Sequence, residues 1–109
     1  MAHDYGAQRA ETYAVYAEIQ SQAEALPDEA DIDYAFVPGA NADWENAQSA
    51  LSDAGFECAQ AEDDNGAPYL NARLPDQPMT AMSIWLGEEM ATRIALPHGF
   101  TPDGWGFLG

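Results

Sequence analysis

The sequence predicts an α+β fold in which a leading helix precedes an antiparallel sheet of four strands. Three observations support this prediction. Apolar residues recur at helical spacing in three stretches, and apolar and polar residues alternate between them, as in half-buried strands. The pair Asn65-Gly66 is a strong hairpin signal, because both residues tolerate positive φ. The elements therefore follow one another as a helix and then β-α-β-β-α-β.

The first two predicted elements differ in the spacing at which apolar residues recur. A helix is predicted over residues 7–26, where apolar residues such as Tyr16 recur on one side. Pro27 ends it, because proline cannot continue the hydrogen-bond ladder. A strand is then predicted over residues 32–37, where the period changes to two.

The middle of the chain is expected to add one helix and a hairpin. The helix is predicted over residues 42–54, with Asn41 as its N-cap. Two strands follow over residues 56–62 and 69–74, on either side of the Asn-Gly turn. Pro75 is expected to end the second of these strands.

The last helix is predicted over residues 81–96, with Thr80 as its N-cap. Its expected buried set is Met82, Trp85, Leu86, Met90 and Ile94. Residues 100–107 are predicted to form a last strand that is broken by a glycine-dependent turn. The whole order favours a ferredoxin-like β-α-β-β-α-β sandwich. We expect residues 1–29 to form a helix that packs on or extends a domain made of residues 30–109.

The charge of the chain limits its partners. Nineteen acidic residues stand against three arginines, with no lysine, and the formal net charge is -16. Such a surface repels nucleic acid and anionic lipid, and attracts arginine-rich protein segments, polyamines or metal cations. An RNA-recognition motif is excluded, since it needs a basic frame around its stacking aromatics. Acidity that serves only solubility is the alternative interpretation.

The sequence contains no recognisable catalytic or metal-binding motif. A single cysteine, Cys58, excludes an internal disulfide and a cysteine-clustered zinc site. Residues 62–66 lack the ligand spacing of a calcium loop, and Glu88 and Glu89 are expected to be solvated surface residues. We therefore expect no enzymatic activity, no cofactor and no metal. Because neither a secretory signal nor a membrane-spanning run is recognised, a cytoplasmic protein is expected.

A family resemblance rests on the tail of the chain. The string Asp103-Gly104-Trp105-Gly106 arrives one strand after a tryptophan-bearing helix. Together with the acidic leading helix and the β-α-β-β-α-β order, it resembles the RraB family over nearly the whole chain. The resemblance implies a ferredoxin-like fold without catalytic residues. It also implies a bacterial regulator that binds the arginine-rich part of the endoribonuclease RNase E and lowers its activity.

The candidate partner-binding residues are acidic side chains in two places and one tryptophan. They are Glu62, Asp63 and Asp64 at the hairpin tip, and Asp103 and Trp105 in the tail. Carboxylates that mimic the phosphate charge of RNA would compete for a cationic, arginine-rich protein segment, such as that of an RNase E-type endoribonuclease. The alternative is that the D-G-W-G string only makes a tight turn, with Trp105 filling a gap at the sheet end.

A second hypothesis belongs to a different class. Ferredoxin-like sandwiches can pair through their open sheet faces and enclose a small-ligand or enzyme site. A pocket lined by polar groups on that face would favour this hypothesis, whereas a filled aromatic face would not. The sequence leaves the choice between monomer and homodimer open.

Overall fold

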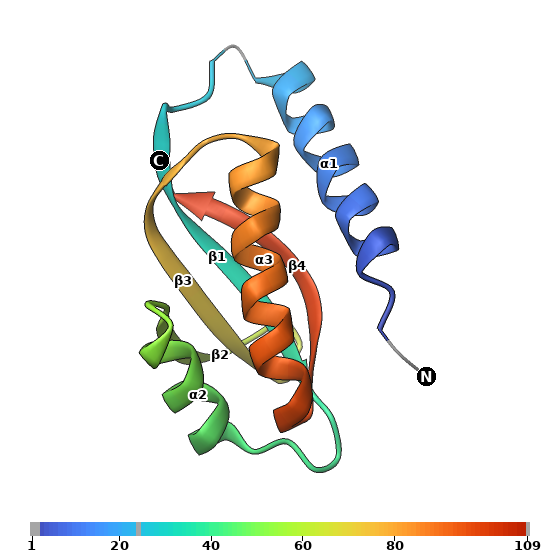
Figure 1. Cartoon of the computed structure of the whole chain (residues 1–109), viewed down its shortest axis with the longest axis vertical. Helices are drawn as coiled ribbons and strands as arrows, with labels where there is room; N and C mark the ends of the chain where they lie inside the picture. The colour runs from blue at the N-terminus through green and yellow to red at the C-terminus, as the bar shows by residue number, and fades with distance from the viewer. Residues whose placement is uncertain (1–2, 24, 109) are drawn as a thin grey trace.

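The computed structural model describes residues 3–23 and 25–108, and it consists of a sheet with helices on one of its faces (Figure 1). The elements are α1 (Tyr5–Gln22), β1 (Glu29–Pro38), α2 (Trp44–Asp53), β2 (Glu57–Glu62), β3 (Pro68–Pro78), α3 (Ala81–Ala95), the 3-10 helix η1 (Leu96–His98) and β4 (Phe100–Leu108). The predicted α+β class, the antiparallel four-stranded sheet and the N-terminal position of the first helix are confirmed.

The sheet has the strand order β2-β3-β1-β4. Strand β1 pairs antiparallel with both β3 and β4, and β2 pairs antiparallel with β3. The alternation of β1 buries Ile32, Tyr34 and Phe36 on the helix side, opposite Ala72 and Leu70 of β3. These central strands therefore form the floor of the hydrophobic core.

The helices cover one face of the sheet. Helix α3 crosses in front of β1 and β3, with α2 on one side and α1 on the other (Figure 1). Gly87 allows the close approach of α3, because a Cβ atom there would clash with Tyr34 Oη. The Tyr34 hydroxyl donates a hydrogen bond to the carbonyl of Ile84, at 2.8 Å. Within residues 3–23 and 25–108, no helix lies on the opposite face of the sheet.

Several element boundaries differ from those predicted. Helix α1 is capped by Asp4, and α2 is capped by Asp43 in place of Asn41. Strand β3 does not end at Pro75 but continues to Pro78, because β1 continues to pair with it there. Prolines are tolerated in this stretch because β2 pairs with β3 only as far as Arg73, so the other edge needs no N–H donors.

The predicted buried face of α3 is wrong in three of its five residues. Met82, Leu86 and Met90 are 61%, 54% and 49% exposed. The helix instead buries a face built mainly from small residues, and the buried set is Ile84, Trp85, Gly87, Glu88, Ala91, Thr92 and Ala95. Small residues occupy the buried face because the helix axis lies close to the sheet, where long side chains would not fit.

The same rotation of α3 overturns the prediction for Glu88. Glu88 is 3% exposed and faces α1, whereas Glu89 lies near the surface and pairs with Arg93 at 3.1 Å. The Thr12 hydroxyl of α1 donates a hydrogen bond to the Glu88 carboxylate. The helix-helix contact between α1 and α3 is therefore polar at its centre.

Candidate functional site

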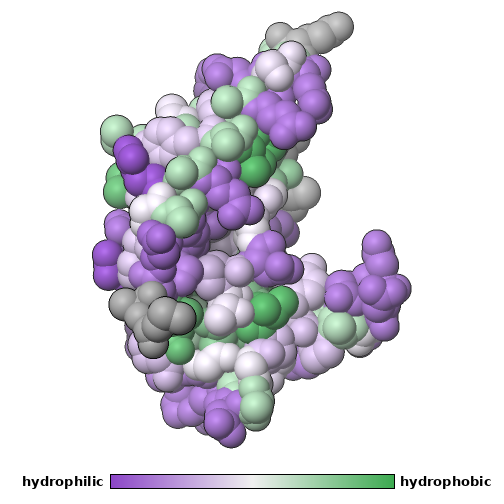
Figure 2. Space-filling view, turned by 90° about the vertical axis from the view of Figure 1, so that its right-hand side faces the viewer, coloured by the Kyte–Doolittle hydropathy of each residue, from purple (hydrophilic) through white to green (hydrophobic). Residues whose placement is uncertain are grey.

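The open face of the sheet carries a hollow of about 710 Å³. All five predicted partner-binding residues line it: Glu62, Asp63, Asp64, Asp103 and Trp105. In Figure 2 this face lies along the right-hand edge, where the outline is hollowed above a projecting hydrophilic arm. The structure thus brings together residues from the hairpin and the tail, which are far apart in sequence.

The hairpin tip is held in shape by one of its own acids. Asp63 Oδ1 accepts hydrogen bonds from the backbone N–H groups of Asn65 and Ala67, at 2.8 and 2.9 Å. The turn also needs Gly66, whose φ is +81°. Since Asp63 is engaged in the turn, the neighbouring exposed carboxylates of Glu62 and Asp64 are better placed to meet a partner.

A β-bulge in β4 directs the tail acid toward solvent. Ala35 of β1 faces two residues, Asp103 and Gly104, because the register shifts between Phe36–Pro102 and Tyr34–Trp105. Gly104 has a φ of +116°, which favours glycine. Asp103 is exposed at the apex of this bulge. The glycine predicted to form a turn therefore forms a bulge within one continuous strand.

Trp105 contributes more to the core than to the surface. It is half-buried and packs against the hydrophobic core. Its indole Nε1 is buried and finds no hydrogen-bond partner in residues 3–23 and 25–108. Trp105 lines the hollow, but the sequence-based alternative that it fills a gap at the sheet end agrees with this packing.

The floor of the hollow contains residues that the sequence reasoning did not single out. Arg73 donates two hydrogen bonds to Asp33, at 2.8 and 3.2 Å, and Asn71 donates a third, at 3.1 Å. Burial alone would raise the pKa of Asp33, but these hydrogen bonds and the charge of Arg73 hold it below its ordinary value. The alternation of β1 and β3 was the signal in the sequence, because it places Asp33, Asn71 and Arg73 on the outward face. Which of these residues lie opposite one another depends on the register between the two strands.

The charge of the hollow is therefore concentrated on its rim. Asp33 lines the floor, and its charge is neutralised by Arg73 beside it. At the rim, Glu62, Asp64 and Asp103 are exposed carboxylates. An extended cationic segment could cross the hollow and meet acids on both sides without meeting an unpaired positive charge.

A second cleft, of about 490 Å³, lies between α1 and β4. Glu88 and Thr12 form its inner wall, and Gln8 of α1 donates a hydrogen bond to Thr92 of α3 at 3.0 Å. Burial raises the pKa of Glu88, and its hydrogen bonds with Thr12 and Gln8 oppose the shift. Sequence reasoning missed this cleft because it assigned Glu88 to the surface.

Two kinds of feature are absent from the part of the chain that the structure describes. No three His, Cys, Asp or Glu side chains there are grouped so that they could hold a metal ion. No helix in residues 3–23 and 25–108 is both long and apolar enough to cross a bilayer.

Comparison with models of protein families gives a match to nearly the whole chain. The family model described as "Regulator of ribonuclease activity B" matches residues 9–107, which include all three helices apart from the start of α1, and all four strands apart from the end of β4. A search of curated proteins found no relative.

Proposed function

Because this chain belongs to the RraB family, whose description is that of a regulator of ribonuclease activity, we propose that it is a non-enzymatic inhibitor of an RNase E-type endoribonuclease. It acts by binding a cationic, arginine-rich segment of that enzyme. The contact surface is the rim of the open-face hollow, with Glu62, Asp63, Asp64 and Asp103 as acidic contacts and Trp105 as an apolar wall.

The observation that carries this proposal is the convergence of the rim acids. Residues from the hairpin tip and from the β4 bulge border one hollow, on the sheet face that no described helix covers. Opposite charge speeds the encounter and fixes the register of the partner, while exposed ion pairs each add little affinity. The inhibitor therefore competes with RNA for arginine side chains, and salt weakens the binding.

We also assign the fold to the ferredoxin-like group. The support is the order β2-β3-β1-β4 with antiparallel neighbours, in which β3 separates β1 from β2 and β1 separates β3 from β4. That is the split arrangement of two β-α-β units. In this assignment α1 is an addition that extends the helical layer beside α3.

Calorimetric titration of a purified arginine-rich segment of an RNase E-type endoribonuclease tests the binding. The test variant combines Glu62→Gln, Asp64→Asn and Asp103→Asn, which leaves the turn acid Asp63 intact. We expect it to bind at least about tenfold more weakly than the natural protein at low salt.

The matched control removes three exposed acids elsewhere, with Glu18→Gln, Glu29→Gln and Glu45→Gln. Each triple variant changes the formal charge from -16 to -13. Equal loss of affinity in both variants would assign the effect to net charge and refute a site at the hollow. Natural protein that binds no arginine-rich segment at low salt would refute the proposed function itself.

A second candidate is supported by the polar lining of the hollow. Asp33, Asn71 and Tyr69 contribute to it, so two copies facing one another could enclose a small ligand. The rim argues against such a dimer, because the acidic residues of one copy would face and repel the same residues of the other. Sedimentation at low and high salt separates the candidates: a dimer in which the hollow is buried would favour the second.

A further inference from the structure

The cleft of about 490 Å³ lies between α1 and β4, which is the edge strand on that side of the sheet (Figure 1). We call it the α1 cleft. Small residues line part of it, among them Ala7 of α1 and Gly104 of β4. A Cβ atom at Gly104 would meet nothing within 4 Å. A volume of this size is within the range of small-ligand sites in proteins.

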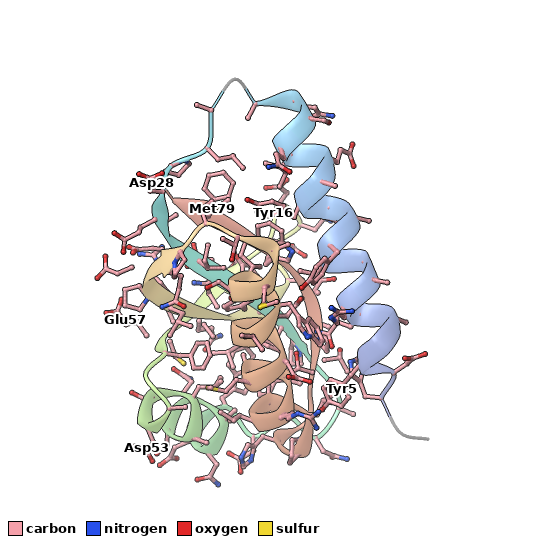
Figure 3. The ribbon with its side chains drawn as sticks, turned by 45° about the horizontal axis from the view of Figure 1, so that its top comes forward. Tyr5, Tyr16, Asp28, Asp53, Glu57 and Met79 are labelled. Atoms are coloured by element: carbon pink, nitrogen blue, oxygen red, sulfur yellow. The ribbon has the colours of Figure 1, made fainter. Side chains whose placement is uncertain are left out.

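Helix α1 rests on α3 at both of its ends and leaves the cleft beside β4. Near its start, Tyr5 stacks with the guanidinium group of Arg93 at 4.2 Å. Near its end, the Tyr16 hydroxyl donates a hydrogen bond to the carbonyl of Met79, just before α3. Figure 3 shows both tyrosines on the side of α1 that faces α3. The cleft therefore follows from the way in which α1 docks.

The inner wall of the cleft contains a buried carboxyl group. Glu88 of α3 lines the cleft although the residue is only 3% exposed. Its hydrogen-bond donors are neutral, namely the Thr12 hydroxyl and the Gln8 amide. Within residues 3–23 and 25–108, no arginine or histidine forms an ion pair with it. Because buried carboxylates are normally paired with a cation, Glu88 indicates a cationic ligand.

Other titratable groups surround Glu88. They are His3, Asp4 and Glu11 from the α1 side, Asp103 of β4 and Tyr34 of β1. Burial raises the pKa of Glu88, the charge of Glu11 raises it further, and the charge of His3 lowers it. Burial and the charge of Glu88 in turn raise the pKa of Tyr34. The surroundings of Glu88 are mainly acidic, and they favour a cation in the cleft.

No arginine of this chain lines the cleft. Arg73 pairs with Asp33 of β1, and Arg93 pairs with Glu89 on the same helix. Arg9 stacks on its neighbour Tyr13, also of α1, at 4.6 Å. The carboxyl groups of the cleft are therefore left to a cation from outside the chain.

The spacing of the acids and the presence of Trp105 indicate which cation fits. In the part of the chain that the structure describes, no three acidic, histidine or cysteine side chains are grouped around one metal position. A guanidinium group suits separated carboxylates, because it spreads five N–H donors over a planar fork. It is also more weakly hydrated than an ammonium group, and it stacks on aromatic rings. The half-buried Trp105 gives the cleft an aromatic wall.

We propose that the α1 cleft binds the guanidinium group of an arginine residue or of a small arginine derivative, with Glu88 as its buried anion. Glu11 and Asp103 contribute exposed carboxylates, and Trp105 contributes the aromatic wall. When the cation binds, Glu88 is ionised and its proton passes to solvent. The cleft is separate from the open-face hollow, and the proposal does not require the partner to be a ribonuclease.

The probes are N-acetylarginine methylamide, which represents an arginine residue, and agmatine, which represents a free small molecule. N-acetylcitrulline methylamide is the control, because it has nearly the same shape and no charge. In an NMR titration we expect at least one arginine compound to bind at least about tenfold more tightly than the citrulline compound. It should shift the amide signals of residues 7–15 and 102–105 and leave those of the hairpin tip in place. The tighter of the two arginine compounds identifies the source of the ligand.

The charge state of Glu88 gives a second readout. A bound guanidinium group should lower the pKa of Glu88, whereas the citrulline compound should leave it unchanged. Carboxyl ¹³C signals followed over pH measure this directly. By linkage, the affinity for the arginine compound should rise as pH increases through the pKa of Glu88. His3→Gln should leave the fall in the pKa in place, which excludes the histidine as its cause.

Variants locate the binding. Glu88→Gln is expected to weaken it by about tenfold, and Glu11→Gln, at an exposed position, by about threefold. Glu18→Gln is the matched control for Glu11→Gln, since it removes the same charge from the same helix outside the cleft. It should leave the affinity unchanged. Glu62→Gln combined with Asp64→Asn should retain at least about a third of the affinity, which separates the cleft from the hollow.

Three results would overturn the proposal. Equal affinity for the arginine and citrulline compounds would show that the cleft does not recognise the cation. An unchanged pKa of Glu88 with the arginine compound bound would place the cation elsewhere. Equal loss of affinity in Glu11→Gln and Glu18→Gln would assign the effect to net charge. None of these results depends on whether the rim of the hollow binds a cationic segment.

Discussion

Glu88 is the buried acid at the contact between α1 and α3, and it links stability to pH. Burial raises its pKa, the charge of Glu11 adds to this, and the hydrogen bonds with Thr12 and Gln8 and the charge of His3 oppose it. The folded protein therefore holds the Glu88 proton more tightly than the unfolded chain does. The contribution of protonated Glu88 to the free energy of unfolding is complete below about pH 4.3, and it is lost as pH rises through the pKa of the folded protein.

Glu88→Gln tests this linkage, since glutamine keeps an oxygen that accepts the Thr12 hydrogen bond but cannot ionise. We expect the free energy of unfolding of the variant, relative to the natural protein, to increase from about pH 4 to about pH 7. Urea unfolding at both pH values measures it. A difference that is the same at both pH values would show that Glu88 does not titrate between them.

Gly87 sets the distance between α3 and the sheet. In Gly87→Ala the new Cβ atom would clash with Tyr34 Oη and would lie 3.2 Å from Leu74 Cδ2, so the helix or these side chains must move. We expect a loss of about 1–3 kcal/mol in the free energy of unfolding, although alanine favours helices. Tyr34→Phe should recover part of that loss in the double variant, measured by chemical denaturation. Strict additivity of the two substitutions would contradict the close contact.

At the scale of elements, α1 is attached to α3 and to the segment just before it by hydrogen bonds at successive turns. Gln8 bonds with Thr92, Thr12 with Glu88, and the Tyr16 hydroxyl donates to the carbonyl of Met79 at 2.8 Å (Figure 3). Thr12 is the residue of α1 that is buried, whereas Val15 is exposed. A helix held mainly by polar contacts should open before the central strands do.

Tyr16→Phe removes one of these attachments. We expect the amides of α1 to exchange with deuterium faster than in the natural protein, by a factor that corresponds to about 0.5–1.5 kcal/mol. The amides of β1 and β3 should keep their rates, and mass spectrometry of peptic fragments distinguishes the two regions. Slower exchange in α1 than in β1 would contradict a loosely attached first helix.

The elements differ in how well the sequence predicted them. The inward positions of β1 were correct because a period of two admits one buried face, and Ile32, Tyr34 and Phe36 fill it. In α3, two different faces fit the spacing of a helix. One is the stripe of Met82, Leu86 and Met90, and the other is the face of small residues. The close approach at Gly87 decided between them, and that distance is a tertiary property.

The candidate site shows the same division. The acids at the hairpin tip and Asp103 were identifiable from turn signals, which place residues at the surface. The pairing of Arg73 with Asp33 depends on the register between β1 and β3, which the sequence does not state. The cleft at Glu88 depends on the rotation of α3, so it was missed for the same reason as the exposed stripe.

At the scale of the whole molecule, mutual repulsion of nineteen acidic residues opposes folding. Salt screens this repulsion more than it weakens the ion pairs Arg73–Asp33 and Arg93–Glu89. We expect the thermal midpoint to rise between low and high NaCl in calorimetry. A midpoint that is unchanged or lower in high salt would mean that the charges are already well separated or balanced.

The two layers of the molecule present surfaces of different chemistry. The rim of the open-face hollow offers carboxylates to a cationic segment. On the helical layer, Met82, Leu86 and Met90 of α3 are exposed apolar side chains.

The rate of RNA cleavage by a purified RNase E-type endoribonuclease tests the central claim most directly. It is measured as natural protein, the rim variant of Glu62, Asp64 and Asp103, or the control variant of Glu18, Glu29 and Glu45 is added. Natural and control proteins should lower the rate to the same extent, and the rim variant should need about tenfold more protein for the same effect. Cleavage that the natural protein does not slow, or that the rim variant slows equally well, would contradict the account.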